Sequence, residues 1–385
     1  MLNSKQLNYL VITPFFPSKD NFRGPYVLDQ VKAIEAVSDY QVTVLKPKSL
    51  FSKQKDYEFE GVKVYYFKRV VLPSNILSGL FNGLSKLFFL KKLKSISLDC
   101  DNITVAHTHV TENGFYANIL KTKNPKIKTV LQHHGFDVLS LENGVLRNLS
   151  WHRNWVRNYG VSICNQIDLH LGVSEKTLSC VRAFSEIKMR SQYVLYNGVD
   201  PNKFYPIDGL KDNTIFKIGC IANFWPLKDQ MTLIKAAQEL IQQGIANLYV
   251  AFIGSGALLN DCKAYVVKHQ LESHITFQKE MTHQELNTFY NTLDLYVMPS
   301  YYEAFGCVYT EAYACGVPFI AVEGQGIAEL ILETDKDKWL IKGKNVHDLV
   351  TCIKGYYQNR TPQKLKRSID IKSLVKDYIK VLQSV

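Results

Sequence analysis

The sequence predicts an α/β fold made of two Rossmann-like domains, each with a parallel sheet. Twelve short apolar runs of strand character alternate along the chain with helical stretches, which is typical of parallel sheets. Twelve strands are too many for one ordinary domain, and 385 residues are enough for two domains with complete cores. A segment rich in turn residues, 197–206, separates the seventh run from the eighth and predicts the linker.

The strands are predicted from apolar runs bounded by turn residues. In the N-terminal half they are residues 9–13, 42–45, 62–67, 103–106, 130–132, 169–173 and 193–196. In the C-terminal half they are residues 216–221, 248–253, 275–278, 295–298 and 319–322. Helices are predicted at 230–242 and 308–314, and a last helix at 363–382.

Composition limits the class of protein. Hydrophobic residues make up 46% and charged residues 21% of the chain, which is typical of a globular protein. The eight cysteines include no C-x-x-C pair, so neither a zinc knuckle nor a disulfide framework is indicated. The sequence also lacks the pattern of a signal peptide and any apolar run long enough to span a membrane. We therefore expect a cytoplasmic protein.

The net charge of +11 is unevenly distributed. Residues 1–200 hold 26 Lys and Arg against 16 Asp and Glu, a net charge of +10, whereas residues 201–385 carry +1. A basic half suits an anionic partner such as a membrane surface, a phosphorylated acceptor or a nucleic acid. The alternative is a lysine-rich surface that contacts only solvent.

Two glutamates, Glu303 and Glu311, stand in the most informative segment of the chain. The predicted strand at 295–298 precedes them, and the predicted helix at 308–314 contains the second one. Glu303 is therefore expected in the loop at the carboxyl end of a buried strand, with Glu311 on the helix that follows. Ligands of doubly wound sheets bind at that edge.

The residues that open this helix suit an anionic ligand. The amides of Phe305, Gly306 and Cys307 would turn toward the same edge, and a helix N-terminus attracts phosphate. A phosphate-bearing sugar donor whose hydroxyls are held by carboxylates fits this arrangement. Two solvated glutamates without a function are the alternative.

The two glutamates, with seven residues between them, resemble the motif of the retaining GT-B glycosyltransferases of family 4, also called glycosyl transferases group 1. The resemblance continues through residues 314–320 and 324–329 and extends to bacterial surface-polysaccharide enzymes. It implies a GT-B fold, in which two Rossmann-like domains face each other across a cleft and close on the substrates. Glu303 would bind the donor sugar, Glu311 the ribose hydroxyls, and Gly326 and Glu329 would add donor contacts.

The resemblance also implies domain boundaries. Residues 1–198 would form an acceptor-binding domain and residues 199–362 a nucleotide-sugar-binding domain. Residues 363–385 would form a helix that packs back on the N-terminal domain.

The loop after the strand at 216–221 resembles the diphosphate-binding loop of the family. The family uses an arginine and a lysine there, and Lys228 matches the lysine. Asn223 stands at the arginine position, where it can donate a hydrogen bond but supplies no charge. A surface lysine at the start of a helix is the alternative for Lys228.

A Gly-x-Gly loop, Gly254 and Gly256, follows the strand at 248–253 and resembles the family loop that lies near the nucleotide. A plain tight turn is the alternative. A dinucleotide fingerprint would need a third glycine where Leu259 stands, so the loop is a weak signal for NAD.

In the N-terminal half, His134 follows the strand at 130–132 and aligns with the family histidine that contacts the donor sugar. Gly24 follows the first strand, and a glycine there lets the backbone approach a diphosphate. The family commonly has two glycines at this point, and this chain has one. His107 and His109 also resemble a family feature, with buried core histidines as the alternative.

A second group of residues suggests a membrane partner. Leucines and phenylalanines at helical spacing over residues 76–88 run into Lys91, Lys92 and Lys94, which predicts an amphipathic basic helix for a membrane interface. Trp151 and Trp155, with neighbouring arginines, form a further aromatic and basic cluster. A helix that faces the core is the alternative.

Two Asp-x-Asp sequences, at 99–101 and 335–337, lie outside the matched motifs. We expect both in exposed loops and therefore predict no metal site.

These patterns predict a glycosyltransferase, and the resemblance to family 4 implies that it retains the configuration at the anomeric carbon. We expect it to move a sugar from a UDP- or GDP-linked donor to a lipid-linked glycan acceptor in bacterial surface polysaccharide synthesis. No further cofactor and no nucleic acid partner are expected. The basic N-terminal half would contact the inner face of the cell membrane. A nucleotide-sugar epimerase or hydrolase of the same fold, a dehydrogenase and a non-enzymatic anion-binding module are the alternatives.

Overall fold

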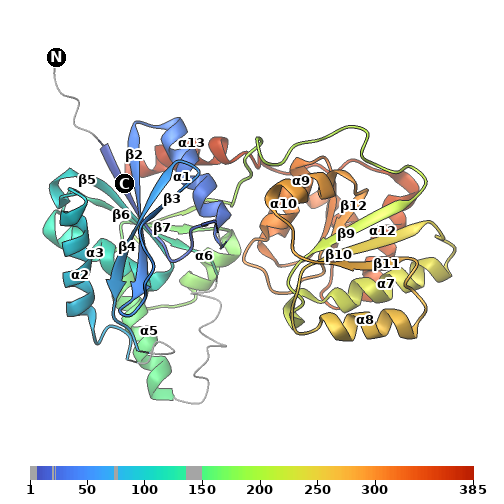
Figure 1. The fold of residues 1–385 in the computed structure, drawn as a ribbon, viewed down its shortest axis with the longest axis horizontal. Coiled ribbons are helices and arrows are strands. Elements are labelled where there is room, and N and C mark those ends of the chain that lie inside the picture. Colours follow the sequence, from blue (N-terminus) through green and yellow to red (C-terminus); the bar gives the residue numbers. More distant parts are fainter. Residues whose placement is uncertain (1–6, 20, 22, 73–76, 136–149) are drawn as a thin grey trace. The chain divides into compact units, whose positions relative to one another are not determined.

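The computed structural model describes residues 7–19, 21, 23–72, 77–135 and 150–385. The chain divides into two compact units (Figure 1). The N-terminal unit comprises Met1–Asn197 and Ile371–Val385, and the C-terminal unit comprises Gly198–Asp370.

The N-terminal unit is built on an eight-stranded sheet with the strand order β3-β4-β2-β1-β5-β6-β7-β8. All its neighbouring strands run parallel except β3, which pairs antiparallel with β4. The strands are β1 (Leu7–Ile12), β2 (Tyr40–Ser49), β3 (Tyr57–Phe59), β4 (Val62–Arg69), β5 (Ile103–His109), β6 (Lys128–His133), β7 (Leu169–Gly172) and β8 (Ser191–Val194). The strand order reverses between β1 and β5, which is where doubly wound sheets bind ligands.

Helices cover both faces of this sheet, as a parallel sheet requires because both of its faces are apolar. The helices are α1 (Pro25–Val37), α2 (Asn82–Ser95), α3 (Gly114–Lys123), α5 (Ser150–Cys164), α6 (Glu175–Arg182) and α13 (Ile371–Ser384). Residues of α1 and α13 pack with Val11 and Val105 in one core cluster. Residues of α2 and α3 pack with Leu10 and Ala106 in the other. Successive residues of each strand therefore point to opposite faces of the sheet and pack in two separate cores.

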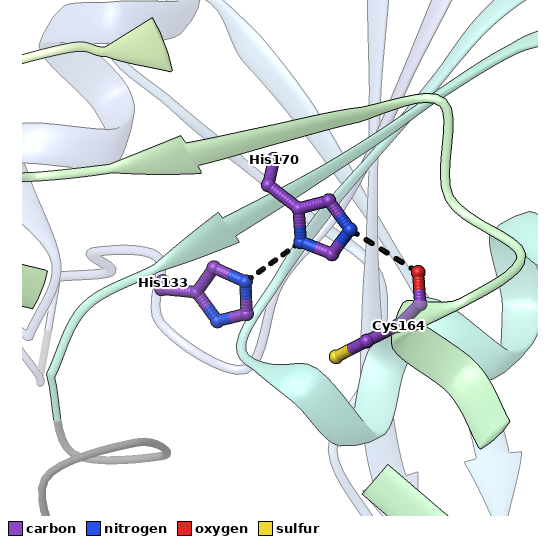
Figure 2. A group of neighbouring side chains, drawn as sticks. All are labelled: His133, Cys164 and His170. Atoms are coloured by element: carbon purple, nitrogen blue, oxygen red, sulfur yellow. Dashed lines mark hydrogen bonds between the residues drawn. The ribbon is translucent and has the colours of Figure 1, made fainter. Parts of the chain in front are cut away.

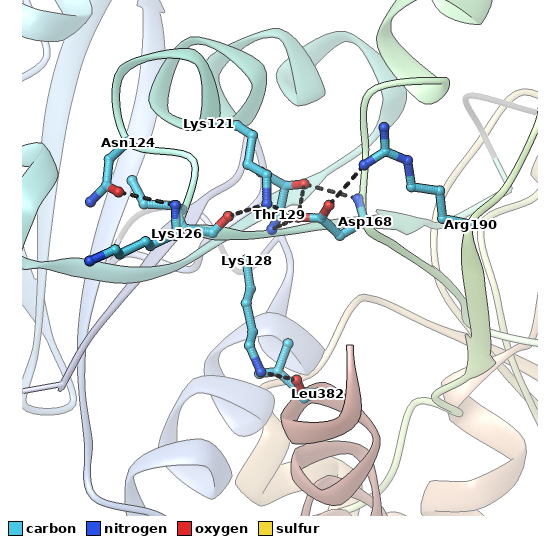
Figure 3. Close-up of polar contacts among 9 residues, drawn as sticks. Lys121, Asn124, Lys126, Lys128, Thr129, Asp168, Arg190 and Leu382 are labelled. Atoms are coloured by element: carbon cyan, nitrogen blue, oxygen red, sulfur yellow. Dashed lines mark hydrogen bonds and ion pairs between the residues drawn. The ribbon is translucent and has the colours of Figure 1, made fainter.

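The C-terminal helix α13 packs against α1 and is tied to the sheet by polar contacts. The hydroxyl oxygens of Tyr378 and Tyr9 are 2.6 Å apart, and the Tyr9 hydroxyl lies 2.6 Å from His107 Nδ1. Lys128 Nζ, at the start of β6, donates to the carbonyl oxygen of Leu382 at 2.8 Å (Figure 3). A cation at a helix C-terminus satisfies carbonyl groups that lack a partner within the helix.

A buried carboxylate joins β6, β7 and α3 in the same unit (Figure 3). Asp168 accepts hydrogen bonds from Lys121 Nζ at 2.8 Å and from the amide and hydroxyl groups of Thr129 at 2.9 Å each. Burial raises the pKa of Asp168, but these hydrogen bonds outweigh burial and hold the pKa below its ordinary value.

The C-terminal unit has a six-stranded, all-parallel sheet with the strand order β11-β10-β9-β12-β13-β14. Its strands are β9 (Phe216–Ile221), β10 (Leu248–Ile253), β11 (Ile275–Gln278), β12 (Leu295–Val297), β13 (Phe319–Val322) and β14 (Leu340–Ile341). Its helices are α7 (Gln230–Gln242), α8 (Leu259–Lys268), α9 (His283–Asn291), α10 (Cys307–Ala314), α11 (Lys336–Trp339) and α12 (Val346–Asn359). Here the strand order reverses between β9 and β12.

Each of the twelve predicted strands corresponds to a strand of the structure, and the fold class of two parallel-sheet α/β units is confirmed. The sequence analysis missed β3 and β14. The strand β14 contains two residues, and β3 is a three-residue edge strand that is only partly buried, so neither carries a long apolar run.

Two helix starts were predicted wrongly. Residues 77–81, expected to be helical, form turns before α2, because Leu77 and Gly79 have left-handed φ values of 49° and 91°. Residues 73–76 lie outside the described residues. The last helix begins at Ile371 rather than near residue 363, because the residues before it bond other segments. The side chain of Gln363 bonds the backbone N–H and carbonyl of Phe319 at 3.0 and 2.9 Å, and Leu365 and Asp370 form isolated bridges with Ile331 and Val199.

Candidate active site

The loops that follow β9 and β12 meet at the carboxyl edge of the C-terminal sheet, where the strand order reverses. The carbonyl oxygen of Leu227, in the β9 loop, accepts hydrogen bonds from the Tyr301 amide at 3.2 Å and from Ser300 Oγ at 3.0 Å. Both donors belong to the β12 loop. These bonds fix the two loops to each other beside the predicted site residues Lys228 and Glu303.

Lys228 and Glu303 form an ion pair between Nζ and Oε1. The Glu303 side chain is 12% exposed and that of Lys228 26% exposed, so the carboxylate is the more enclosed partner. The Glu303 amide donates to Gln325 Oε1 at 2.7 Å. Two charged groups of opposite sign, 75 residues apart in the sequence, therefore stand together at this edge.

The second glutamate is placed by a buried tyrosine. Glu311 lies on α10, and its Oε2 accepts a hydrogen bond from the Tyr290 hydroxyl, on α9, at 2.9 Å. Burial foremost, and then the negative charge of Glu311, raise the pKa of Tyr290 well above its ordinary value, so this hydroxyl keeps its proton. The contact leaves Glu311 a hydrogen-bond acceptor in a fixed position.

The start of α10 depends on a glycine. Gly306 precedes the helix with φ 92°, and a Cβ there would lie 2.7 Å from the Tyr309 ring. The side chain of Phe305 is buried, so a contact of this residue with a ligand could involve only its backbone. Gly326 and Glu329 lie on the short helix η5 (Gly326–Leu330), which follows β13.

The Gly-x-Gly loop supports the loop that carries Asn223. A Cβ on Gly254 would lie 2.2 Å from the Ala222 carbonyl oxygen, and a Cβ on Gly256 would lie 2.7 Å from the Phe224 nitrogen. Only glycine allows the two backbones to approach so closely. Asn223 itself is exposed at this position.

The N-terminal unit brings its own predicted residues together at the carboxyl edge of its sheet. Gly24 directly precedes α1 with φ 86°, and a Cβ there would lie 2.8 Å from the Phe15 backbone. The half-buried His134 ring lies near Phe15, with ring centroids 6.4 Å apart, and near Tyr26, with centroids 5.2 Å apart. His134 Nε2 lies 2.8 Å from His109 Nδ1.

A separate histidine pair lies beside Cys164, the last residue of α5 (Figure 2). His133 Nε2 is 3.1 Å from His170 Nδ1, and His170 Nε2 donates to the Cys164 carbonyl oxygen at 3.1 Å. Burial foremost, and then His133, lower the pKa of His170 to about 3, so the ring is neutral. With its proton on Nε2, the neutral His170 ring must accept through Nδ1, and His133 must donate.

The buried side chains of His133, Cys164 and His170 have potential ligand atoms, two ring nitrogens and one Sγ, within 4.8 Å of one another, which is close enough to coordinate one metal ion. An ion would have to displace the hydrogen bond that already joins His133 to His170. Of the Asp-x-Asp residues, Asp99 is exposed and bonds the Cys100 amide, and Asp335 pairs with Lys338.

The two clusters predicted to face a membrane are joined in the structure. Trp155 Nε1, on α5, donates to the Ser78 carbonyl oxygen at 2.8 Å, and the Tyr159 hydroxyl donates to Asn82 Oδ1 at 3.2 Å. Leu80, Leu84, Leu87, Trp151 and Trp155 are all exposed. No helix within the described ranges is both long enough and apolar enough to cross a bilayer.

The sequence analysis missed Tyr290 and Gln325 as residues that hold the two glutamates. Tyr290 gives no local signal, because its contact with Glu311 depends on how α9 packs against α10. Gln325 lies within the segment 324–329 that resembles the family, but that resemblance assigns donor contacts only to Gly326 and Glu329.

Two family models match the chain in succession. The model described as Glycosyltransferase Family 4 matches residues 24–203, and the model described as Glycosyl transferases group 1 matches residues 203–371. An uncharacterized glycosyltransferase of Methanocaldococcus jannaschii is 26% identical over 301 residues, which are 75% of this chain and 77% of that protein.

Two further proteins are similar over most of their length. The UDP-Gal:alpha-D-GlcNAc-diphosphoundecaprenol alpha-1,3-galactosyltransferase of Escherichia coli is 21% identical over 314 residues, 77% of this chain and 76% of that protein. The crystal structure of Anabaena HepE in complex with UDP aligns with 98% of this chain and 100% of that one, at 16% identity and a TM-score of 0.71. Together with the two parallel-sheet units, these matches show that the chain belongs to the GT-B glycosyltransferases of family 4.

Proposed function

We propose that this glycosyltransferase moves a sugar from a nucleoside-diphosphate sugar to a lipid-linked glycan, with retention at the anomeric carbon, in the synthesis of a bacterial surface polysaccharide. The observation that carries the proposal is the Lys228–Glu303 ion pair at the edge where β9 and β12 adjoin. A cation for the diphosphate and a carboxylate for the sugar hydroxyls are the two groups that such a donor needs at one place.

On this proposal, donor binding exchanges the partners of the ion pair. Lys228 turns to the diphosphate, whose charge grows as the bond to the sugar breaks, and Glu303 accepts hydrogen bonds from the donor sugar. Glu311, held by Tyr290, accepts hydrogen bonds from the ribose hydroxyls. The amides of Phe305, Gly306 and Cys307 at the start of α10, with Gly326 and Glu329 on η5, add donor contacts.

Asn223 replaces the arginine that the family resemblance leads one to expect. Its side-chain amide can donate a hydrogen bond to a phosphate oxygen but carries no charge. The cation that the family resemblance assigns to this loop is therefore Lys228 alone. Gly24 lets the backbone approach the phosphate, and His134 contributes to binding of the donor sugar.

Retention follows from attack on the face that the diphosphate leaves. The bond between the anomeric carbon and the phosphate oxygen breaks, and the acceptor hydroxyl bonds to the same face of that carbon. The hydroxyl proton passes to the departing phosphate oxygen. No enzymic nucleophile and no metal ion take part in this scheme.

The acceptor assignment draws on the N-terminal unit and on one relative. Exposed leucine and tryptophan side chains on α2, α5 and the turn before α2 lie among Lys86, Lys91, Lys94 and Arg153, which are exposed too. We name this the α2–α5 surface. It has the composition of a surface that lies in the headgroup region of an anionic bilayer. The similar Escherichia coli enzyme acts, by its name, on a diphosphoundecaprenol-linked sugar.

The first experiment is a thermal-shift series with UDP, GDP, ADP, CDP, TDP and NAD, each with and without a divalent metal ion. We expect UDP or GDP to raise the melting temperature equally in both conditions. Stabilisation by NAD alone, or by none of the nucleotides, would contradict the donor site. The anomeric configuration of the product, read by NMR after transfer from the matching nucleotide sugar, then decides between retention and inversion.

A further inference from the structure

The hydrogen bond between His109 and His134 joins two neighbouring strands of the N-terminal sheet. His109 is the last residue of β5, and His134 directly follows β6, which pairs with β5 in parallel. The distance of 2.8 Å between His109 Nδ1 and His134 Nε2 is that of a well-formed hydrogen bond. His134 is half-buried, whereas His109 is 1% exposed.

His109 is itself rigidly held. Its ring stacks on His107 with centroids 4.7 Å apart and an interplanar angle of 11°, and its carbonyl oxygen accepts a hydrogen bond from Asn113 Nδ2 at 2.9 Å. Burial foremost, and then the neighbouring histidines, hold the pKa of His109 well below its ordinary value. The ring is therefore neutral and carries one N–H and one lone pair.

Other side chains restrict the His134 ring. Its centroid is 5.0 Å from that of His109, with an interplanar angle of 17°, and Tyr26 and Phe15 lie near it at the centroid distances given above. A hydrogen bond between two ring nitrogens needs a proton on one and a lone pair on the other. While both rings are neutral, the bond to His109 therefore couples the tautomer of His134 to that of a fixed, buried partner.

We propose that His109 is a positioning residue, which fixes the ring orientation and the proton placement of His134 through this hydrogen bond. The effect on transfer rests on the proposed function, because it requires His134 to contact the donor sugar. The effect on the His134 ring does not, since it follows from the geometry of the N-terminal unit alone.

The test measures the ring of His134 directly and then the reaction. In full-length protein labelled with 15N-histidine, at a pH where the His134 ring is neutral, we expect His134 to show one protonated and one unprotonated ring nitrogen. His109→Leu should replace these signals by averaged positions of two exchanging tautomers. His109→Asn, whose amide can occupy about the place of Nδ1, should restore them. Averaged signals already in the unmodified protein, or unchanged signals in His109→Leu, would overturn the inference.

The kinetic arm separates positioning from a general loss of stability. His109→Leu should lower kcat by about tenfold with a smaller change in donor KM, and His109→Asn should recover most of it. The control is Tyr9→Phe, which removes the buried hydroxyl that bonds both the neighbouring His107 and Tyr378 and leaves the His109–His134 bond in place. Equal effects of Tyr9→Phe and His109→Leu on kcat would overturn the kinetic part. If His134→Ala transfers sugar normally while the NMR result holds, the role of His134 in the proposed function fails and the positioning stands.

Discussion

Lys228 and Glu303 are ion-paired across the two loops that flank the strand-order reversal of the C-terminal sheet. Each charge therefore has a partner at the place where we propose that the donor binds. A substitution that removes one member of a mostly buried ion pair leaves the charge of the other member without a partner. The pair is therefore both a structural contact and the centre of the proposed donor site.

Lys228→Ala and Glu303→Ala should each lower turnover by about 100-fold or more, because on the proposed function Lys228 stabilises the developing charge of the diphosphate and Glu303 binds the donor sugar. Circular dichroism should show a retained fold in both. Lys263→Ala, which removes an exposed lysine of α8, is the control and should keep normal turnover. Near-normal rates in either site variant would remove that residue from the mechanism.

Tyr290→Phe should weaken binding of the nucleoside diphosphate by about tenfold, because Glu311 loses the hydroxyl that positions it. Isothermal titration calorimetry measures this directly. Tyr249→Phe is a matched control, since it removes a hydroxyl bonded to Thr276 at 2.8 Å. An unchanged affinity in Tyr290→Phe would show that Glu311 needs no such support or does not bind the nucleotide.

The double change Leu84→Ser and Leu87→Ser on the α2–α5 surface should reduce binding to anionic vesicles by about tenfold, because it removes apolar area that would enter the bilayer interface. Co-sedimentation with vesicles of phosphatidylglycerol and phosphatidylcholine measures the bound fraction. Val267→Ser, on exposed Val267 of α8, is the matched control. Equal binding of all three proteins would argue against this surface as the membrane contact.

Asp168→Asn should lower stability at pH 7 by roughly 1–3 kcal/mol, because the Lys121 ion pair is lost and the hydrogen bonds from Thr129 weaken. The folded pKa of Asp168 is lowered, so its contribution is present above the pKa of the unfolded chain and is lost as pH falls through the folded value. The melting temperatures of the two proteins should therefore converge in acid, which thermal unfolding at a series of pH values will show. A difference in melting temperature that stays the same at every pH would contradict the proposed contribution of the ionised Asp168 to stability.

The His133–His170 pair should make the N-terminal unit sensitive to mild acid. The pKa of His170 is about 3 in the folded protein, below the value of about 6.5 in an unfolded chain, so the unfolded state takes up the proton first. The contribution of the neutral His170 ring to the free energy of unfolding is complete above about pH 6.5. Below that pH it falls by about 1.4 kcal/mol per pH unit. His170→Gln should unfold with a flatter pH dependence, whereas the control His347→Gln, at an exposed position, should match the unmodified protein. If the stability of His170→Gln and of the unmodified protein changed with pH in the same way, His170 would not be the source of the acid sensitivity.

Much of the fold was predictable because buried parallel strands leave a strong local signal. β10 and β13 are continuous apolar runs, and their sequence bounds agree with the structure. The start of α2 was not predictable from apolar spacing, because Leu77 and Gly79 adopt left-handed conformations that the spacing of apolar residues does not reveal. In the structure, Gly79 faces the Tyr159 ring, where a Cβ would lie 2.7 Å away. That contact joins segments far apart in the sequence.

The sequence by itself determined the α/β class, the two-domain organisation and the identity of the candidate residues, because hydrophobic periodicity and short motifs are local properties. Tertiary structure alone decided which side chains meet. Lys228 reaches Glu303 because β9 and β12 are adjacent strands, Tyr290 reaches Glu311 because α9 packs beside α10, and His109 reaches His134 because β5 pairs with β6. Spacing along the chain carries no information about these neighbours, since each contact depends on strand order and helix packing.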